Sequence, residues 1–233
     1  MKHTPLKPAQ LMQLLQLADS AFPVGSFAFS DGLESAVAEG LVHDAATLAR
    51  YTEAIVRRTA TTDAVAALHA VRACRRNDYT AVCAADRALL CTKLGDEARQ
   101  MQQRTGRKLT ELAAALFDDP LLRQFRSDLQ AGRTPGCCPV AQGVLFAACG
   151  LTDEALFATI LYGAANRVLN AALRCVRVSH IDTQRILAAI GPDAAARYAE
   201  VAELELDEMH AFTPQIDLLA ALHEQGTGRL FMN

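Results

Sequence analysis

The sequence predicts an all-α protein, a single-domain bundle of roughly ten helices that spans residues 1–233. Ala and Leu are plentiful, Trp is absent, and aromatic residues make up only 6% of the chain. Such a composition favours helices, because Ala and Leu lose little on entering one. Val, Ile and Tyr form none of the alternating runs that predict strands. No long linker, repeat or shift in composition divides the chain, so one domain is the simplest organisation.

The first two helices are predicted from apolar spacing and from capping residues. Apolar residues recur at helical spacing over residues 11–18, and this helix must stop before Pro23. Asp31 is expected to cap the second helix, because Glu34 follows at the position that completes a capping box. Gly40 is expected to end that helix.

Start and stop signals outline the remaining helices. Asp119 followed by Pro120 is a strong start, with Asp at the cap and Pro at the first helical position. Thr152 and Asp153 open the longest apolar stripe. The expected helices cover residues 44–76, 79–94, 97–117 with a break allowed at Gly106, 119–132, 140–149, a long helix from 152, one helix on each side of 191–192, and 213–226.

Charge, hydropathy and cysteine usage exclude several classes of protein. The net charge of −3 gives no basic face for nucleic acid. No stretch of about 18 apolar residues is free of charge, so no membrane-spanning helix is expected. The first residues lack the apolar core of a secretory signal. The seven cysteines are odd in number and form no CxxC pair, so we expect a cytoplasmic protein.

Three patterns could suggest metal chemistry, and each has a simpler structural explanation. Cys137 and Cys138 could offer thiolates to a soft metal, but adjacent side chains point apart, and two small residues in a tight turn are the expected alternative. His223 and Glu224 match half of an HExxH zinc motif whose second His is missing. The acidic run over residues 200–208 is expected to be a solvated face. The chain has no P-loop and no GxSxG motif, so neither a cofactor nor a catalytic residue is predicted.

Two unusual segments remain. Residues 14–37 join two apolar helical stretches through a linker that holds Phe22, Phe27 and Phe29, which predicts a packed linker or a presented surface rather than a generic loop. The C-terminal tail, GTGRLFMN, ends a flexible Gly-Thr-Gly with Arg229 beside large apolar residues. An Arg next to a Phe is a favoured interface anchor. A tail folded back onto its own core is the other open interpretation.

The segment at residues 14–37, LLQLADSAFPVGSFAFSDGLESAV, resembles the opening of the UreF family of urease accessory proteins. Four further matches follow in the family's order. They are Glu97 with Arg99 for E-x-R, residues 105–109 in part for M-G-[RK]-x-L, residues 139–143 for P-V-x-x-G, and residues 223–224 with 229–231 for the closing HE and RLF. Each match alone is weak, and their order makes the resemblance specific.

The sequence also departs from the family pattern. Ser26 stands where many members have Gly, and Phe29 stands where His or Tyr is common, which puts a polar contact there in doubt. Cys137 and Cys138 replace positions that often carry His just before P-V, which weakens a metal interpretation further.

The resemblance implies an all-α accessory protein that is not an enzyme and carries no cofactor. UreF-like proteins form homodimers, bind the accessory protein UreD (also called UreH), and recruit the GTPase UreG to apo-urease, where GTP hydrolysis is coupled to nickel transfer. The alternatives are a helical bundle or enzyme that binds a metal or cofactor, and a helical interaction protein unrelated to urease.

The resemblance and the residues together suggest which positions contact partners. Residues 1–8 are expected to be a flexible N-terminus, and residues 226–233 a tail that a UreD-like partner orders. Glu97 and Arg99 are expected to form ion pairs between helices. The expected partner-binding residues are Phe22, Pro23, Gly25, Ser26, Phe27, Phe29, Ser30, His223, Glu224, Arg229, Leu230 and Phe231.

Overall fold

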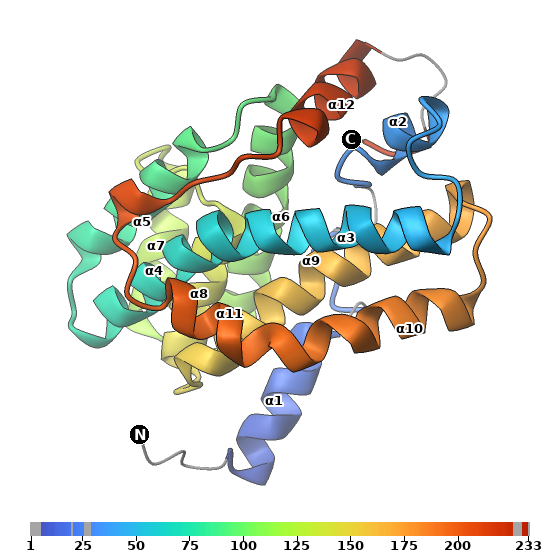
Figure 1. The fold of residues 1–233 in the computed structure, drawn as a ribbon. Coiled ribbons are helices and arrows are strands. Elements are labelled where there is room, and N and C mark those ends of the chain that lie inside the picture. Colours follow the sequence, from blue (N-terminus) through green and yellow to red (C-terminus); the bar gives the residue numbers. More distant parts are fainter. Residues whose placement is uncertain (1–5, 20, 26–28, 226–229, 233) are drawn as a thin grey trace.

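The computed structural model describes residues 6–19, 21–25, 29–225 and 230–232, and over these residues the protein is all-α (Figure 1). Twelve α-helices and no strand are found in these ranges, which confirms the predicted fold class. Of the expected flexible residues 1–8, residues 1–5 lie outside the described ranges, Leu6 packs against the core, and Pro8 begins the first helix.

The helices follow one another through short connections. The first six are α1 (Pro8–Ala18), α2 (Leu33–Ala38), α3 (Ala45–Thr59), α4 (Val65–Arg75), α5 (Tyr79–Cys91) and α6 (Asp96–Leu116). The last six are α7 (Pro120–Gln130), α8 (Cys138–Ala148), α9 (Asp153–Cys175), α10 (His180–Ile190), α11 (Ala194–Val201) and α12 (Pro214–Gln225).

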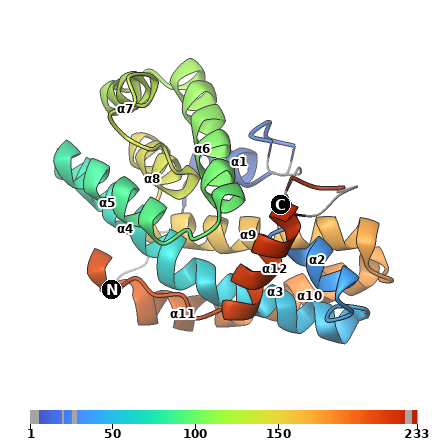
Figure 2. The same ribbon diagram turned by 90° about the horizontal axis from the view of Figure 1, so that it is seen from above.

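The helices gather around two main apolar clusters, with α9 running along the middle of the molecule (Figure 2). Helices α4 to α8 enclose the first cluster, and α2, α3, α9, α10 and α12 enclose the second. A third cluster lies where α3, α4, α8 and α9 meet, and it joins the other two into one interior. Residues from both ends of the sequence meet in the second cluster.

The helix predicted over residues 44–76 is two helices joined by a π-helical turn, Ala60–Ala64. Asp44 caps its start as expected, accepting a hydrogen bond from the Thr47 amide at 2.8 Å. The π turn inserts an extra residue into the helix, which periodicity in the sequence does not reveal. It places Asp63 in the interior, with 7% of its surface exposed.

Asp63 accepts three side-chain hydrogen bonds, from Thr62, from Gln102 at 2.6 Å, and from the ammonium group of Lys93. Burial alone would raise the pKa of Asp63, but the charge and hydrogen bond of Lys93, with those of Thr62 and Gln102, lower it below its usual value. Lys93 is itself only 5% exposed and belongs to the connection between α5 and α6. This pair therefore ties the π turn to the start of α6.

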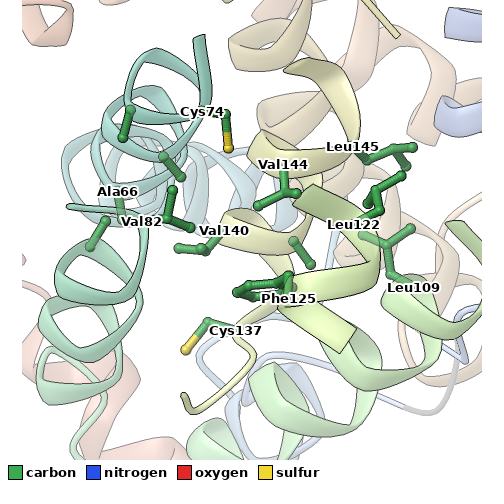
Figure 3. Packing of buried hydrophobic residues seen from close by; sticks show 14 of the residues in the cluster. Ala66, Cys74, Val82, Leu109, Leu122, Phe125, Cys137, Val140, Val144 and Leu145 are labelled. Carbon is green, nitrogen blue, oxygen red and sulfur yellow. The ribbon is translucent and has the colours of Figure 1, made fainter. Parts of the chain in front are cut away.

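Figure 3 shows the first cluster, in which Leu109 of α6 and Val140 of α8 are among the buried side chains. These two helices approach closely because of a backbone contact at Gly106. A break in the helix was allowed there, but α6 continues through it. A Cβ atom at this position would lie 2.0 Å from the Gly136 carbonyl oxygen. Glycine is therefore needed for α6 to lie so close to the turn that precedes α8. Asp86 holds that turn by accepting hydrogen bonds from the Thr134 hydroxyl and from the amides of Gly136 and Cys137, at 2.6 to 2.7 Å.

Gly106→Ala should destabilise the protein by about 1–3 kcal/mol, because the added methyl group overpacks a rigid backbone contact. Urea unfolding followed by circular dichroism measures this change. Gly163→Ala is the matched control, since Gly163 lies in α9 with no atom within 4 Å of its built Cβ. That variant should be stabilised by about 0.5–1 kcal/mol. Equal stability of the two variants would contradict the role assigned to Gly106.

Lys93→Met should destabilise the protein by about 3–5 kcal/mol, because it leaves the Asp63 carboxylate buried without its cation. Lys108→Met, which removes an exposed lysine 3.9 Å from Glu111, should change stability by less than about 0.5 kcal/mol. The double variant Asp63→Asn with Lys93→Met should recover part of the loss. If the effects of Asp63→Asn and Lys93→Met on the free energy of unfolding simply add in the double variant, Asp63 and Lys93 are not a coupled pair.

Candidate functional site

The C-terminal tail, α2, α12 and the start of α6 meet at one place, where several of the predicted site residues come together (Figures 1 and 2). We call this place the tail junction and define it by Glu34, Glu97, His223, Glu224 and Phe231. These residues are separated by up to about two hundred positions in the sequence, so only the fold brings them into contact.

The Glu34 side chain binds the main chain of the tail. Its Oε1 accepts a hydrogen bond from the Leu230 amide at 2.8 Å, and its Oε2 accepts one from the Phe231 amide at 3.2 Å. The capping box expected for Glu34 and Asp31 is therefore wrong: the carboxylate that suits a local cap binds a segment from the other end of the chain. Gly32, with φ +78°, occupies the cap position of α2.

His223 lies between two carboxylates. Its Nδ1 is 2.8 Å from Oε2 of Glu97, and its Nε2 is 3.1 Å from Oε2 of Glu34. The residue is 3% exposed, and it joins α12 to α2 and α6. His223 and Glu224 were expected to be a partner-binding pair, and this structure places His223 inside the protein instead.

Glu224 caps the start of α6. Its Oε1 accepts a hydrogen bond from the Glu97 amide at 2.9 Å, where the positive end of the helix dipole favours an anion. A Cβ at Gly95 would lie 3.0 Å from the same oxygen, so this glycine leaves room for the carboxylate. Two neighbouring residues of α12 thus bind the start of α6. His223 contacts the Glu97 side chain, and Glu224 accepts a hydrogen bond from the Glu97 amide.

Phe231 inserts into the second cluster of the core. It is 6% exposed, and the guanidinium carbon of the exposed Arg174 on α9 lies 5.7 Å from the centre of its ring. This is a cation–π distance. Phe231 was expected to be ordered by a partner, and here it packs against its own chain. Leu230 and Met232 on either side are 66% and 44% exposed, while Arg229 lies outside the described residues.

The aromatic linker near the N-terminus is only partly a surface. Phe29 and Ser30 are buried, Phe22 is half-buried against the first cluster, and Pro23 and Gly25 are exposed. Gly25 has φ +80°, a conformation that favours glycine. Ser26 and Phe27 lie outside the described residues.

Asp31 anchors this linker to α9. Its carboxylate accepts a hydrogen bond from Nε of Arg167 at 2.7 Å, and its carbonyl accepts one from the Tyr51 hydroxyl at 2.6 Å. Burial would lower the pKa of Arg167, but Asp31 raises it above its usual value. Sequence reasoning missed Arg167, because a single Arg in an apolar helix shows nothing about its partner.

Arg99 does not form the expected ion pair in the described part of the chain. Its Nε donates to the Lys93 carbonyl at 2.8 Å, so it braces the connection between α5 and α6. Glu97 does contact another helix, through His223. The two members of the E-x-R pattern thus act on opposite sides of the start of α6.

The cysteine pair is built into the turn that Asp86 holds. The Cys137 amide and thiol both donate to Asp86, to its carboxylate and its carbonyl respectively. Burial raises the pKa of Cys137, and it raises that of Cys138 to about 11, so burial favours the protonated form of both thiols. Among the described residues, no group of three or more His, Cys, Asp or Glu side chains is placed to hold a metal ion.

A hollow of about 130 Å³ lies between Phe22 and α9 and is also lined by Gln102 and Arg167. Organic cofactors usually occupy pockets of about 300–1,000 Å³, so this space suits molecules no larger than a few waters. The Oε1 atom of Gln102 is buried there with no hydrogen-bond partner in the described part of the protein.

Among the described helices, α9 is long and apolar enough to cross a membrane by length and composition. However, 61% of its most apolar window is buried inside the protein, as in the central helix of a folded domain. This finding gives only weak support for a membrane span.

Comparison with known proteins identifies the family. The UreF family model matches residues 42–191. The chain is 44% identical over 223 residues to a urease accessory protein UreF 2 of Brucella canis, a match that covers 96% of this chain and 92% of the relative. It is 35% identical over 229 residues to a urease accessory protein UreF of Yersinia pseudotuberculosis, covering 98% of this chain and all of the relative. These matches confirm the resemblance seen in the sequence: the chain belongs to the UreF family of urease accessory proteins.

Proposed function

We propose that the chain is a non-catalytic scaffold for urease maturation. It would bridge a UreD/UreH-like protein and a UreG-like GTPase on apo-urease, and regulate GTP-dependent delivery of nickel to the urease active site in the cytoplasm. Family membership carries this proposal. The sequence has no P-loop, so GTP binding is assigned to the partner.

The docked tail would supply a contact surface for the UreD-like partner. Phe231 fixes the tail to the body, and Leu230 and Met232 then project from a backbone that Glu34 holds in place. Side chains presented from an ordered segment bind with less loss of entropy than those of a free tail. The tail would therefore contribute its exposed apolar residues to the interface and keep Phe231 as its internal anchor.

Helix α1 is a candidate surface for the expected homodimer or for urease. None of its residues carries a charge, and Leu11, Met12 and Leu15 are about half-exposed or more. Depletion of charge is typical of the centre of an interface. Leu14 and Leu17 on the same helix pack against the core, so α1 has apolar residues on both faces.

Leu230→Asp should lose most of its binding to the UreD-like protein, because a charge would be buried in an apolar contact. A loss of at least about tenfold is expected, at the scale of an interface hot spot. Co-purification of tagged protein with the UreD-like partner measures it. Leu116→Asp is the matched control, since Leu116 is 53% exposed at the end of α6, outside the tail junction. Undiminished binding of Leu230→Asp, or an equal loss in Leu116→Asp, would argue against the tail surface.

The scaffold role itself is tested by reconstitution. Apo-urease, nickel, GTP and the UreD-like and UreG-like proteins should yield active urease only when this chain is present. The measurement is urease activity together with the nickel content of the purified urease. Full activation in the absence of the chain, or activation that is equal with GDP, would overturn the proposal.

A further inference from the structure

We propose that an exposed basic stripe on α6 extends the tail surface and binds an acidic segment of the protein that takes the tail. The stripe consists of Arg104, Arg107 and Lys108. The inference rests on the proposed function, because its partner is the UreD-like protein. It adds the charge of the surface that this protein would present to the chain.

The stripe lies on the face of α6 that points away from the core. The buried residues of this helix, such as Met101 and Leu109, face the interior. Arg104, Arg107 and Lys108 are exposed, and they follow one another at spacings of three and four residues. Side chains at these spacings are neighbours on the surface of a helix. The three cations therefore form one patch, although the chain as a whole has a net charge of −3.

These cations line an open groove of about 430 Å³ between α6 and the loop that precedes α8. The other residues that line it are Gln100, Gln103, Glu111 and Pro135. Among these described lining residues Glu111 alone is acidic. The groove thus holds more positive than negative charge and no large apolar side chain, which suits an anionic ligand rather than an apolar one.

Contacts within the chain leave most of this charge unused. Arg107 makes no ion pair or hydrogen bond with any residue that the structure describes. Nη1 of Arg104 lies 3.8 Å from Sδ of Met232, which is only a weak acceptor. Lys108 lies 3.9 Å from Glu111, and an exposed pair at this distance stabilises little. Guanidinium groups bind carboxylates through paired hydrogen bonds, so the stripe is complementary to carboxylates.

The stripe begins where the described tail ends. Arg104 contacts Met232, which is exposed beside Leu230 on the surface proposed for the UreD-like partner. Figure 2 shows the C-terminal end of the chain close to α6. A partner that covers these two tail residues lies next to Arg104 and meets Arg107 and Lys108 about one turn further along α6. The tail and the stripe therefore form one continuous surface.

A protein segment suits this groove better than a small molecule or a nucleic acid. The groove is shallow, since the Lys108 and Glu111 side chains that line it are 52% and 47% exposed. Small-molecule sites usually bury about 70–90% of the ligand surface. Nucleic acid is disfavoured because a chain of net charge −3 repels a polyanion and the stripe supplies only Arg104, Arg107 and Lys108 against it.

Exposed charges of this kind act mainly on the rate of association. Attraction between a basic patch and an acidic surface steers the encounter of two proteins, and salt screens this attraction. Exposed ion pairs add little to the final affinity. The stripe should therefore speed association at low ionic strength, whereas the apolar contacts of Leu230 and Met232 set the rate of dissociation.

Biolayer interferometry with the immobilised UreD-like protein measures both rate constants for the full-length chain. At about 50 mM salt, Arg107→Glu should slow association by about fivefold or more, and Arg107→Gln should slow it by less. At about 500 mM salt, the effect of Arg107→Glu should fall below about twofold, because salt screens the attraction. Circular dichroism and thermal unfolding check that both variants fold as the wild type does.

Arg185→Glu is the matched control for net charge. Arg185 is exposed on α10, which is not part of the tail junction, and it lies 3.9 Å from Asp182. This variant changes the net charge by the same amount as Arg107→Glu. General repulsion would slow association equally in the two variants, whereas a local stripe predicts that Arg185→Glu associates at the wild-type rate.

Four results would overturn the proposal. Three concern the partner: unchanged association of Arg107→Glu at low salt, equal slowing in Arg185→Glu, or an effect that persists at high salt. The fourth is tight binding of a single-stranded oligonucleotide that Arg107→Glu abolishes, which would assign the stripe to nucleic acid.

Failure of the stripe and failure of the proposed function give different results. If Leu230→Asp loses binding while Arg107→Glu associates at the wild-type rate, the tail surface stands and only the stripe is removed. If the wild-type chain does not bind the UreD-like protein at any salt concentration, the proposed partner contact fails and the stripe fails with it.

Discussion

Contact between His223 and two carboxylates joins parts of the chain that otherwise have little to hold them together. Helix α2 has six residues, too few to be stable alone, and the described residues 230–232 of the tail form neither a helix nor a strand. Both are fixed by Glu34, and Glu34 is fixed by a histidine from α12. The position of α12 is set in turn by Glu97 and by the start of α6. The tail junction therefore depends on α6 being correctly placed.

The placement of α6 also rests on buried polar groups around the π turn and the turn that Asp86 holds. Lys93 and Gln102 bind Asp63 in the π turn, and Arg99 braces the connection that carries Lys93. Further along, Gly106 lets α6 approach the turn that Asp86 organises. Buried charges of this kind add specificity more than stability, because desolvation offsets most of their attraction. Here they connect the start of α6 to the π turn.

Local signals in the sequence predicted local structure and failed where distant residues compete. Asp44 and Asp119 cap their helices as expected, because each needs only amides two or three residues away. Asp31 and Glu34 match a cap pattern equally well, yet Arg167 and the tail bind their carboxylates. Periodicity could not show the π turn, and composition could not show the partners of Asp63, Asp86 or His223. The resemblance marked the right residues of the tail junction without saying that they meet.

The tail is held by few contacts, and this bears on how a partner could use it. The described residues 230–232 are fixed by the buried Phe231 side chain with Arg174 over its ring, two amide hydrogen bonds, and a contact of Arg104 with the Met232 sulfur. Segments with so few contacts open at a free energy well below that of global unfolding. A partner that binds only the docked form would therefore need little differential affinity to shift the tail almost wholly to that form. A tail held in the core by several side chains would already be docked, so partner binding could not change its position. A tail without Phe231 as its anchor would have to be ordered on binding, and that loss of entropy would reduce the affinity for the partner.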